Sequence, residues 1–184
     1  MGDALLPLRT ERLLLRPYED GDLEALYEMH RREDVTRYLP WSIRSLEEAR
    51  AMLDRRKVLR RFEEDGDGLV LALVLPETST VVGDVDLQLR SVEHKQGEIG
   101  YVLRPDAWGQ GYATEAAAAM LRLGFEAFGL HRIVGRIDAR NEASARVLER
   151  LGMRREAHFR ENEFLKSEWT DEFVYAILSR EWRP

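Results

Sequence analysis

The most informative stretch of this chain is RPDAWGQGYATEA, residues 104–116. It follows an apolar segment ending at Leu103 and leads into an alanine-rich segment with helical periodicity. Pro105 ends the strand, and the glycines at 109 and 111 let the loop bring several backbone N–H groups together. The start of a helix adds four donors and the positive end of its dipole. The stretch therefore predicts an anion-binding loop, with phosphate as the common ligand.

Three other interpretations of this loop stay open at this point. A nucleotide-hydrolysing P-loop ends in Gly-Lys-Ser/Thr, whereas this loop continues as Gly111-Tyr112-Ala113. A dinucleotide-binding loop has a third glycine where this chain has Thr114, and it follows the first strand of its domain. The third interpretation is a tight turn into an alanine-rich helix, with no ligand.

The segments around the loop predict an α+β (mixed α/β) domain. Two helices come early, a run of consecutive strands follows, and the only long crossover comes after the glycine-bearing loop. The ranges 12–16, 69–75, 81–89, 98–103, 132–138, 153–164 and 168–178 are predicted strands, and 22–32, 45–62, 112–128 and 142–151 are predicted helices.

Composition narrows the possible functions. A chain of 184 residues that is 44% hydrophobic is predicted to form one domain over residues 1–184. Its formal net charge of −6 argues against a nucleic-acid partner and suits a neutral or cationic substrate. The absence of cysteine excludes disulfides and thiol nucleophiles. The four histidines have no metal-binding spacing, so no metal is expected.

Neither a targeting segment nor a membrane span is expected. The first residues, MGDALLPLRTERLLLRP, are charged early and lack the apolar core of a signal peptide. The longest apolar run, Leu69–Leu75, is far shorter than the roughly 20 residues that span a bilayer. We therefore expect a cytoplasmic protein without a membrane partner.

The loop resembles the acyl-CoA loop of the GNAT N-acetyltransferase superfamily, whose signature is Arg/Gln-x-x-Gly-x-Gly/Ala. Three more stretches resemble its branch of ribosomal-protein N-terminal acetyltransferases: LRTERLLLRPY from Leu8, NEASARVLERLGM from Asn141 and WTDEFVYAIL from Trp169. Together they cover nearly the whole chain in the expected order. The resemblance implies a mostly antiparallel twisted sheet of about seven strands, splayed between the fourth and fifth, with about four flanking helices.

The resemblance also implies acetyl-CoA as co-substrate, no metal, and a monomer or homodimer. The pantetheine arm is expected between the 98–103 and 132–138 strands, and the pyrophosphate on backbone N–H groups of the loop. Trp108 stands where the signature has Arg or Gln, so backbone donors are expected to hold the phosphates. The implied cofactor-binding residues are Tyr101, Val102, Leu103, Trp108, Gly109, Gln110, Gly111, Tyr112, Ala113, Thr114, Asn141 and Arg146.

Two of these residues have a second interpretation. Asn141 directly precedes a predicted helix and is a good N-cap, a role compatible with contacting the cofactor. Arg146 is expected to pair with Glu142 one turn earlier, or to reach the 3′-phosphate together with Arg140 or Arg150.

Acetyl transfer to an amine requires a neutral nitrogen, and an α-amino group with a pKa of about 8 loses its proton more readily than lysine at about 10.4. Glu98, beside the acyl site, is the candidate general base, and its other interpretation is an exposed strand-end carboxylate. Glu161 and Glu163 are alternative acids. Many family members carry a thiolate-stabilising tyrosine where this chain has Leu148, so Ser144, or water, is assigned that task.

The acceptor is expected to meet Tyr38, Trp41 and Glu161, although the aromatic pair also suits a plug between two helices. The favoured function is acetyl transfer from acetyl-CoA to a primary amine, with a protein N-terminus as acceptor. The alternatives are a small-molecule acetyltransferase acting on an aminoglycoside, polyamine or metabolite, and a catalytically silent acyl-CoA sensor.

Overall fold

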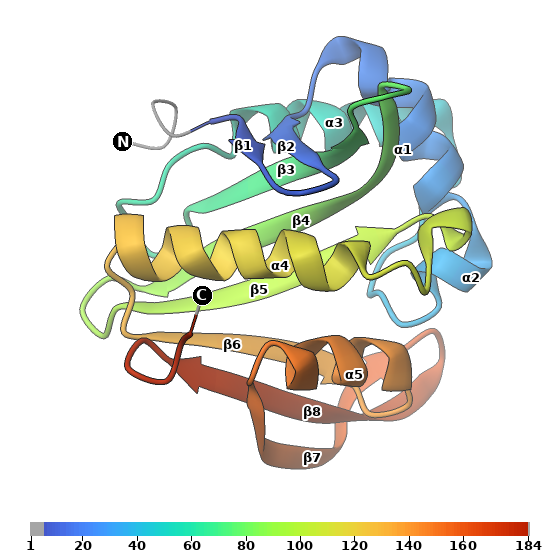
Figure 1. Cartoon of the computed structure of the whole chain (residues 1–184). Helices are drawn as coiled ribbons and strands as arrows, with labels where there is room; N and C mark the ends of the chain where they lie inside the picture. Colours follow the sequence, from blue (N-terminus) through green and yellow to red (C-terminus); the bar gives the residue numbers. More distant parts are fainter. Residues whose placement is uncertain (1–5, 184) are drawn as a thin grey trace.

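An eight-stranded sheet runs through the protein, of which the computed structural model describes residues 6–183 (Figure 1). The strand order is β1-β2-β3-β4-β5-β6-β8-β7, and among these described strands only β5 and β6 pair in parallel. The strands are β1 (Leu8–Arg9), β2 (Leu14–Pro17), β3 (Gly68–Leu75), β4 (Thr80–Ser91), β5 (Gln96–Leu103), β6 (Arg132–Asp138), β7 (Arg154–Leu165) and β8 (Glu168–Leu178). The predicted α+β architecture with a mostly antiparallel sheet is confirmed.

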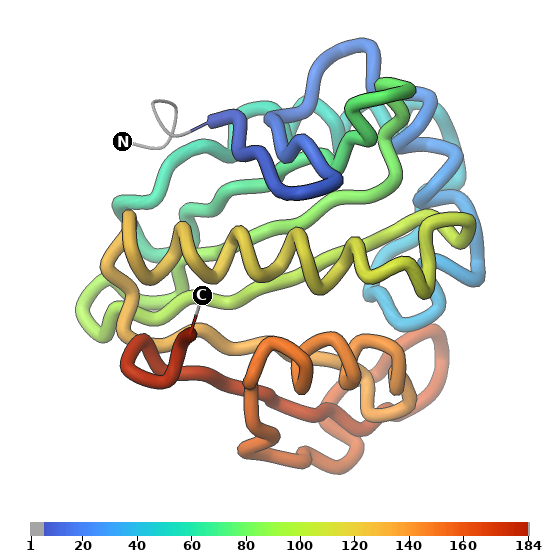
Figure 2. Tube along the Cα trace, in the orientation of Figure 1, coloured from blue at the N-terminus to red at the C-terminus, as the bar shows by residue number. Residues whose placement is uncertain are grey.

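Helices cover both faces of this sheet. Figure 1 shows α4 and α5 crossing the near face, while α1 and α3 lie behind β3 and β4. Figure 2 traces the same layers along the chain and shows the long excursion of residues 20–60 behind the sheet. The helices are α1 (Leu23–His30), α2 (Glu33–Thr36), α3 (Leu46–Val58), α4 (Tyr112–Arg122) and α5 (Glu142–Arg150).

Side chains along β4 alternate between the two faces of the sheet, and a hydrophobic core lies on each face. Val85 and Leu87 point into the core beneath α4 and α5, as the apolar periodicity predicts. Asp84 precedes Val85 and Asp86 lies between Val85 and Leu87, so both aspartates point to the opposite face. There α1 and α3 cover only part of the sheet, with a second core around Tyr18, Leu26 and Leu53. The polar side of β4 therefore faces the space that α3 leaves open.

The structure adds two short elements to the predicted ones. Within residues 6–183 the sheet has eight strands rather than about seven, because of the two-residue β1. The same residues form five α-helices rather than about four, because of the four-residue α2. Elements of that length give no periodic signal. The predicted 112–128 helix ends as an α-helix at Arg122 and continues as one π-helical turn, Leu123–Ala127. No helix among residues 6–183 is long and apolar enough to cross a membrane.

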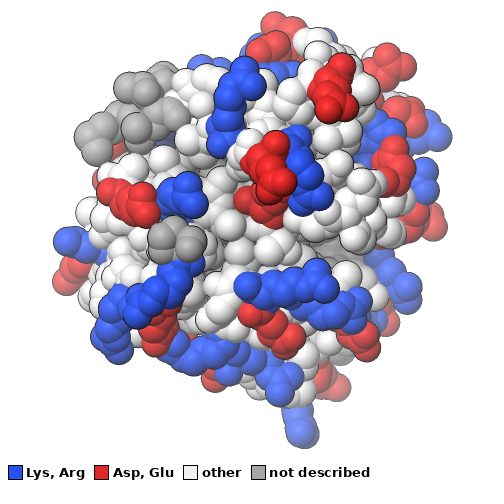
Figure 3. All heavy atoms as spheres, viewed as in Figure 1, with Lys and Arg blue, Asp and Glu red and all other residues white. Residues whose placement is uncertain are grey.

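Charged side chains are mixed over the face seen in Figure 3, with basic residues gathered toward the lower half, where α5 and β7 lie. Arg146 on α5 and Arg154 on β7 both have exposed side chains that pair with nearby glutamates. Pairing of this kind leaves the basic groups accessible to a second anion, because exposed ion pairs are weak.

Candidate active site

The loop between β5 and α4 has the geometry of an anion-binding helix start. After a short 3₁₀ turn at Pro105–Ala107, Gly109 and Gly111 take positive φ angles of 72° and 83°. Gly111 is the N-cap of α4, a left-handed conformation that glycine adopts without strain. No heavy atom lies within 4 Å of a Cβ built on Gly109, so a ligand can approach the backbone there. The helix start presents its free N–H groups at the same place.

Side chains of the loop bind back to its own backbone. Trp108 Nε1 donates to the Leu103 carbonyl at 2.9 Å, and Gln110 Nε2 donates to the Asp106 carbonyl at 2.8 Å. The hydroxyl of Thr114, in the first turn of α4, is buried and has no hydrogen-bond partner among the described residues. Backbone donors and this hydroxyl fit a phosphate-bearing ligand such as the pyrophosphate of coenzyme A.

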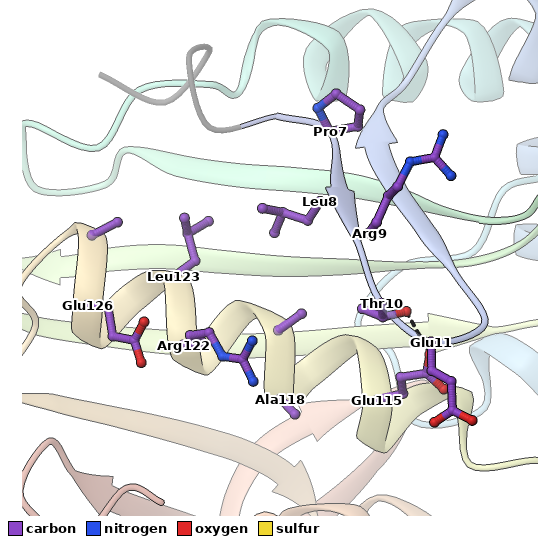
Figure 4. Close-up of a pocket in the computed structure, with 12 residues that line it drawn as sticks. Pro7, Leu8, Arg9, Thr10, Glu11, Glu115, Ala118, Arg122, Leu123 and Glu126 are labelled. Atoms are coloured by element: carbon purple, nitrogen blue, oxygen red, sulfur yellow. Dashed lines mark hydrogen bonds between the residues drawn. The ribbon is translucent and has the colours of Figure 1, made fainter. Parts of the chain in front are cut away.

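Arg12 fastens the N-terminal part of the chain to this loop. Its Nη1 donates to the Gln110 carbonyl at 2.8 Å and its Nε to Glu115 Oε2 at 2.7 Å, and the guanidinium lies over the Tyr112 ring. Thr10 Oγ1 also donates to Glu115, at 2.6 Å (Figure 4). Burial acts to raise the pKa of Glu115, but the hydrogen bonds from Thr10 and Arg12 hold it below its ordinary value.

Sequence reasoning missed this anchor. Arg12 lies in a stretch quoted for its resemblance to a family, but nothing local connects it to a loop about 100 residues further along the chain. The anchor borders a cavity of about 650 Å³ between β1 and α4, lined by residues of both charges (Figure 4). That cavity shares no lining residue with the larger one described below.

The predicted splay between β5 and β6 is present. The two strands pair only from Gln96↔Arg132 to Glu98↔Val134, whereas β5 stays paired with β4 as far as Leu103. Beyond Glu98 the edge of β5 that faces β6 therefore has free backbone groups. A pantetheine arm, which carries amide groups, suits such an open strand edge.

The N-terminus of α5 closes the far side of the splay. Asn141 Oδ1 accepts from the Ser144 N–H at 3.1 Å, which confirms the predicted N-cap. Tyr101 Oη reaches across the gap and donates to the Ser144 carbonyl at 3.0 Å, and burial raises the pKa of Tyr101. Leu148, where the family tyrosine is missing, is buried in the core. The structure thus places a different tyrosine hydroxyl, that of Tyr101, beside Ser144.

A cavity of about 800 Å³ extends from the splay across the polar side of β4 and β5. The loop before α3, α3 itself, and the β7–β8 hairpin form its other walls. Seven of the predicted site residues line it: Tyr38, Trp41, Glu98, Tyr101, Val102, Asn141 and Ser144. Seven more lie next to one another in the chain, four on the neighbouring loop and three in the first turn of α4: Trp108, Gly109, Gln110 and Gly111, then Tyr112, Ala113 and Thr114.

Three predicted residues lie apart from that cavity lining. Leu103 is buried in the core at the end of β5, and Arg146 is exposed and pairs with Glu142 at 3.3 Å. Glu161 is exposed at a bulge of β7, with a positive φ of 46°, and its backbone N–H donates to Asp171. Glu163, two residues further along, lines the cavity instead.

Glu98, the predicted base, lines the cavity but carries an ion pair. Its Oε2 accepts from Arg90 Nε at 2.9 Å, and its side chain is 21% exposed. The same arrangement holds for Glu172, which binds Arg136 through both carboxylate oxygens. Arginine therefore neutralises the charge of both Glu98 and Glu172.

A buried cluster around Asp84 forms the end of the cavity beneath α3. One carboxylate oxygen, Oδ2, accepts from Tyr18 Oη at 2.9 Å, contacts His30 Nε2 at 3.3 Å and binds Arg56. Burial acts to raise the pKa of Asp84, but the Arg56 charge, with His30 and Tyr18, outweighs it and lowers that pKa to about 2. Asp84 is therefore ionised throughout the physiological range.

Asp86, two residues along the same strand face, is in the opposite electrostatic situation. Burial, the negative charge of Asp84 and that of Glu98 raise the pKa of Asp86 to about 7, and Arg56 opposes them only partly. Sequence reasoning missed both aspartates. The available signal was the β4 segment itself, where two carboxylates alternate with Val85 and Leu87 in a strand that is otherwise apolar.

Comparison with known proteins decides the family. The model of the acetyltransferase (GNAT) domain matches residues 12–154. The chain belongs to the GNAT acetyltransferase family. Members of this N-acetyltransferase family use acetyl-CoA, and coenzyme A is bound in related solved structures.

Full-length relatives share the GNAT fold. The uncharacterized N-acetyltransferase YnaD of Bacillus subtilis is 35% identical over 95% of this chain and 98% of its own length. The crystal structure of a GNAT-family acetyltransferase from Bacillus anthracis matches with a TM-score of 0.86 and 34% identity, over 96% of this chain and all of that one. The ribosomal protein uS5-alanine N-acetyltransferase of Escherichia coli is 24% identical over 96% of this chain and 93% of its own.

Among residues 6–183, no group of three or more His, Asp or Glu side chains is arranged to hold a metal ion.

Proposed function

We propose that residues 1–184 act as one acetyltransferase domain that moves the acetyl group of acetyl-CoA to a protein N-terminal α-amino group. The proposal rests on one observation above all, the cavity of about 800 Å³ whose lining includes the splayed part of β5, the Tyr38–Trp41 loop and residues of the β7–β8 hairpin. A cavity of that shape can admit the end of an extended chain. The uS5-alanine acetyltransferase among the relatives supports the same class of acceptor.

The chain's own residues divide the work of binding. Backbone N–H groups from Gly109 to Thr114 bind the pyrophosphate, and Arg146 reaches the 3′-phosphate by exchanging its exposed pair with Glu142. The open edge of β5 at Tyr101 and Val102 binds the pantetheine amides. When bound, acetyl-CoA supplies the activated acetyl group.

On the acceptor side, Tyr38 and Trp41 contact the first residues of the entering chain, and Glu163 attracts its cationic end. Ser144, with Tyr101 beside it, stabilises the leaving sulfur by hydrogen bonding. Glu98 holds the Arg90 guanidinium in an ion pair beside the splay, so Glu163 rather than Glu98 supplies the negative charge that attracts the amine.

Purified protein tests this proposal with acetyl-CoA and three matched acceptors: a peptide with a free α-amino group, the same peptide blocked at that group but bearing an internal lysine, and spermidine. We expect mass spectrometry to find acetylation of the free α-amino group, with kcat/KM at least about tenfold above that of the blocked peptide, because of the lower pKa of the α-amine.

A small cationic amine is the second candidate, and the acidic lining formed by Asp84, Asp86 and Glu163 favours it. Turnover of spermidine with no peptide product would establish this alternative. Binding of acetyl-CoA without thiol release for any amine would establish the sensor alternative. Binding itself is measured as a melting-temperature shift, about 5–11 °C at 100 times the dissociation constant.

We further propose that the protein works in the cytoplasm as a monomer or homodimer. Mass photometry or sedimentation of the purified chain distinguishes the two states.

A further inference from the structure

Asp86 is a partly buried carboxylate in the cavity that none of the roles above uses. We propose that Asp86 accepts the proton that the acceptor's ammonium group must lose before its nitrogen can attack the acetyl group. The proposal rests on amine acetylation in this cavity and does not depend on which amine is the natural acceptor.

Geometry places Asp86 beside the reacting edge of β5. Asp86 is paired with Gly100 in the β4–β5 register, and a Cβ built on Gly100 would lie 2.5 Å from Asp86 Oδ1 and 3.3 Å from Oδ2. The carboxylate therefore lies directly over the backbone of β5, in space that any other residue at position 100 would fill. Only glycine leaves that space open.

The part of the β5 edge that is not paired with β6 begins next to Gly100. Pairing with β6 ends at Glu98, two residues before Gly100, so β5 has no strand partner on that side where Asp86 overlies it. Because strands of a sheet lie roughly 4.8 Å apart, the carboxylate is about one strand width from the free edge. An acyl group held at that edge and an amine entering from the Tyr38–Trp41 side meet next to Asp86.

The Asp86 carboxylate takes part in little hydrogen bonding, so its oxygens can accept a proton. Arginine holds three nearby carboxylates of the lining, those of Asp84, Glu98 and Glu172. Among the described residues, the hydrogen bond recorded for the Asp86 side chain comes from the Gln88 amide, at a weak 3.3 Å. No Lys or Arg of residues 6–183 is recorded in an ion pair with it.

The charged groups that face Asp86 come from three elements. Asp84 on β4 and Glu98 on β5 disfavour its ionised form, as burial does, while Arg56 on α3 favours it but is bound to Asp84. Their balance raises the pKa of Asp86 to about 7. A general base works best when its pKa is close to the working pH, and here the environment places it there.

The proton balance of the reaction is complete with this residue. The ammonium group gives one proton to Asp86, and the neutral nitrogen then forms the new bond to the acetyl carbon while the carbon–sulfur bond breaks. The departing thiolate takes up the second proton of that nitrogen, directly or through water. Asp86 then releases its proton to solvent through the open cavity, and no other reactant is needed.

Asp86→Asn is the variant that tests the proposal, because it keeps the shape and removes the proton acceptor. Glu98→Gln makes the same change at the other candidate base, and Asp34→Asn makes it at an exposed carboxylate that does not line the cavity, so Asp34→Asn is the control and should keep the wild-type kcat and its rise through pH 7. All three are assayed for kcat against pH, from 5.5 to 9.5, with any primary amine that the wild-type protein acetylates. We expect Asp86→Asn to lower kcat about 100-fold and leave the KM for acetyl-CoA within about twofold.

In the wild-type protein kcat should rise through pH 7. In Asp86→Asn that rise should vanish and leave only the ionisation of the amine itself, near pH 8 for an α-amino group. Glu98→Gln should keep a rise but move it to lower pH, because the Glu98 charge is one of the causes that raise the pKa of Asp86. A kcat for Asp86→Asn within about threefold of wild type, with the rise intact, overturns the proposal.

A melting-temperature comparison provides a second readout that needs no turnover. A carboxyl whose pKa is raised by folding destabilises the protein once it ionises, so its favourable contribution is present at low pH and is lost as the pH rises through about 7. We therefore expect Asp86→Asn to melt about 3 °C or more above wild type at pH 8 and close to it at pH 5. Equal differences at both pH values overturn the assignment.

The test of Asp86 can succeed or fail independently of the test of the N-terminal acceptor. If the wild-type protein acetylates spermidine but no peptide, the N-terminal acceptor is wrong, and the Asp86 experiment proceeds unchanged with spermidine.

Discussion

Asp84 and Asp86 are the same residue type, two positions apart on one face of β4, and their surroundings shift their pKa values in opposite directions. Around Asp84, helix α3 supplies Arg56, and Tyr18 and His30 complete a buried cluster that lowers the pKa to about 2. Around Asp86 no Lys or Arg of residues 6–183 is recorded in an ion pair with the carboxylate, and burial and the charges of Asp84 and Glu98 raise its pKa to about 7.

This contrast shows how one strand serves both stability and chemistry. A carboxylate with a buried arginine stays ionised and ties α1 and α3 to the sheet. Its neighbour, left without such a partner and repelled by that same charge, can exchange a proton near neutrality. Two carboxylates whose surroundings drive their pKa values apart are the usual sign of separate roles.

The largest expected effect comes from breaking the buried cluster. Asp84→Asn leaves Arg56 buried without its counter-ion, which should lower the free energy of unfolding by about 3–5 kcal/mol and the melting temperature by about 10 °C. Differential scanning calorimetry at pH 7 measures both. Asp86→Asn is the control, and it should not melt below wild type at that pH.

The pH dependence of Asp84 should also be opposite to that of Asp86. Because folding lowers the pKa of Asp84, its stabilising contribution is present above the unfolded value of about 3.9 and is lost as the pH falls through about 2. The wild-type protein should therefore lose its advantage over Asp84→Asn only in strong acid. An advantage that disappears already at pH 5 would contradict the assigned ion pair.

The next effect tests whether the position of Asp86 matters as much as its charge. Gly100→Ala puts a methyl group 2.5 Å from Asp86 Oδ1 and should displace the carboxylate from β5. We expect kcat to fall about tenfold and stability to fall by about 1–3 kcal/mol. Gly68→Ala, where the nearest atom to the new Cβ is 3.3 Å away, is the matched strand control and should keep its kcat.

A smaller effect is expected at Arg12, where a substitution should weaken cofactor binding without affecting either aspartate. Arg12→Gln removes the ion pair to Glu115 and weakens the support of the Gln110 carbonyl. The KM for acetyl-CoA should rise about 3- to 10-fold while kcat changes little, since binding is loosened and chemistry is untouched. Arg9→Gln, in the exposed β1, is the control. If the Asp86→Asn variant raised this KM as strongly as Arg12→Gln, the division between the two regions would be wrong.

The smallest effect is expected at the surface. Asp34 binds Arg32 through two hydrogen bonds, which hold the pKa of that exposed carboxyl below its ordinary value. Asp34→Asn should shift the melting temperature by less than about 1 °C, because exposed ion pairs add little to stability. A shift as large as that of Asp84→Asn would show that burial is not what distinguishes the two aspartate–arginine pairs.

Most of the fold was predictable because its signals are local. The alternation of β4, the continuous apolar run of β3 and the N-cap at Asn141 each involve residues within one element. The predicted cofactor loop followed from Gly109 and Gly111 before a helical segment. The elements that were missed, β1 and α2, are too short to carry a period.

The candidate site was predictable only in part. Glu98, Tyr101, Ser144 and Trp41 do line one cavity, because strand order and the helix start bring them there. The sequence could not show that Glu98 would be paired with Arg90, since that contact depends on the register between two strands.

From the residues alone, most of the strands and helices, the position of the predicted phosphate-binding loop and the family that the chain resembles could be read. These properties depend on short-range periodicity, on glycine and proline, and on the order of motifs. Only the tertiary structure decided which acid stays charged and which holds a proton near pH 7. A pKa depends on burial and on charges from α3, β4 and β5 together, and folding alone brings those three elements around one carboxylate.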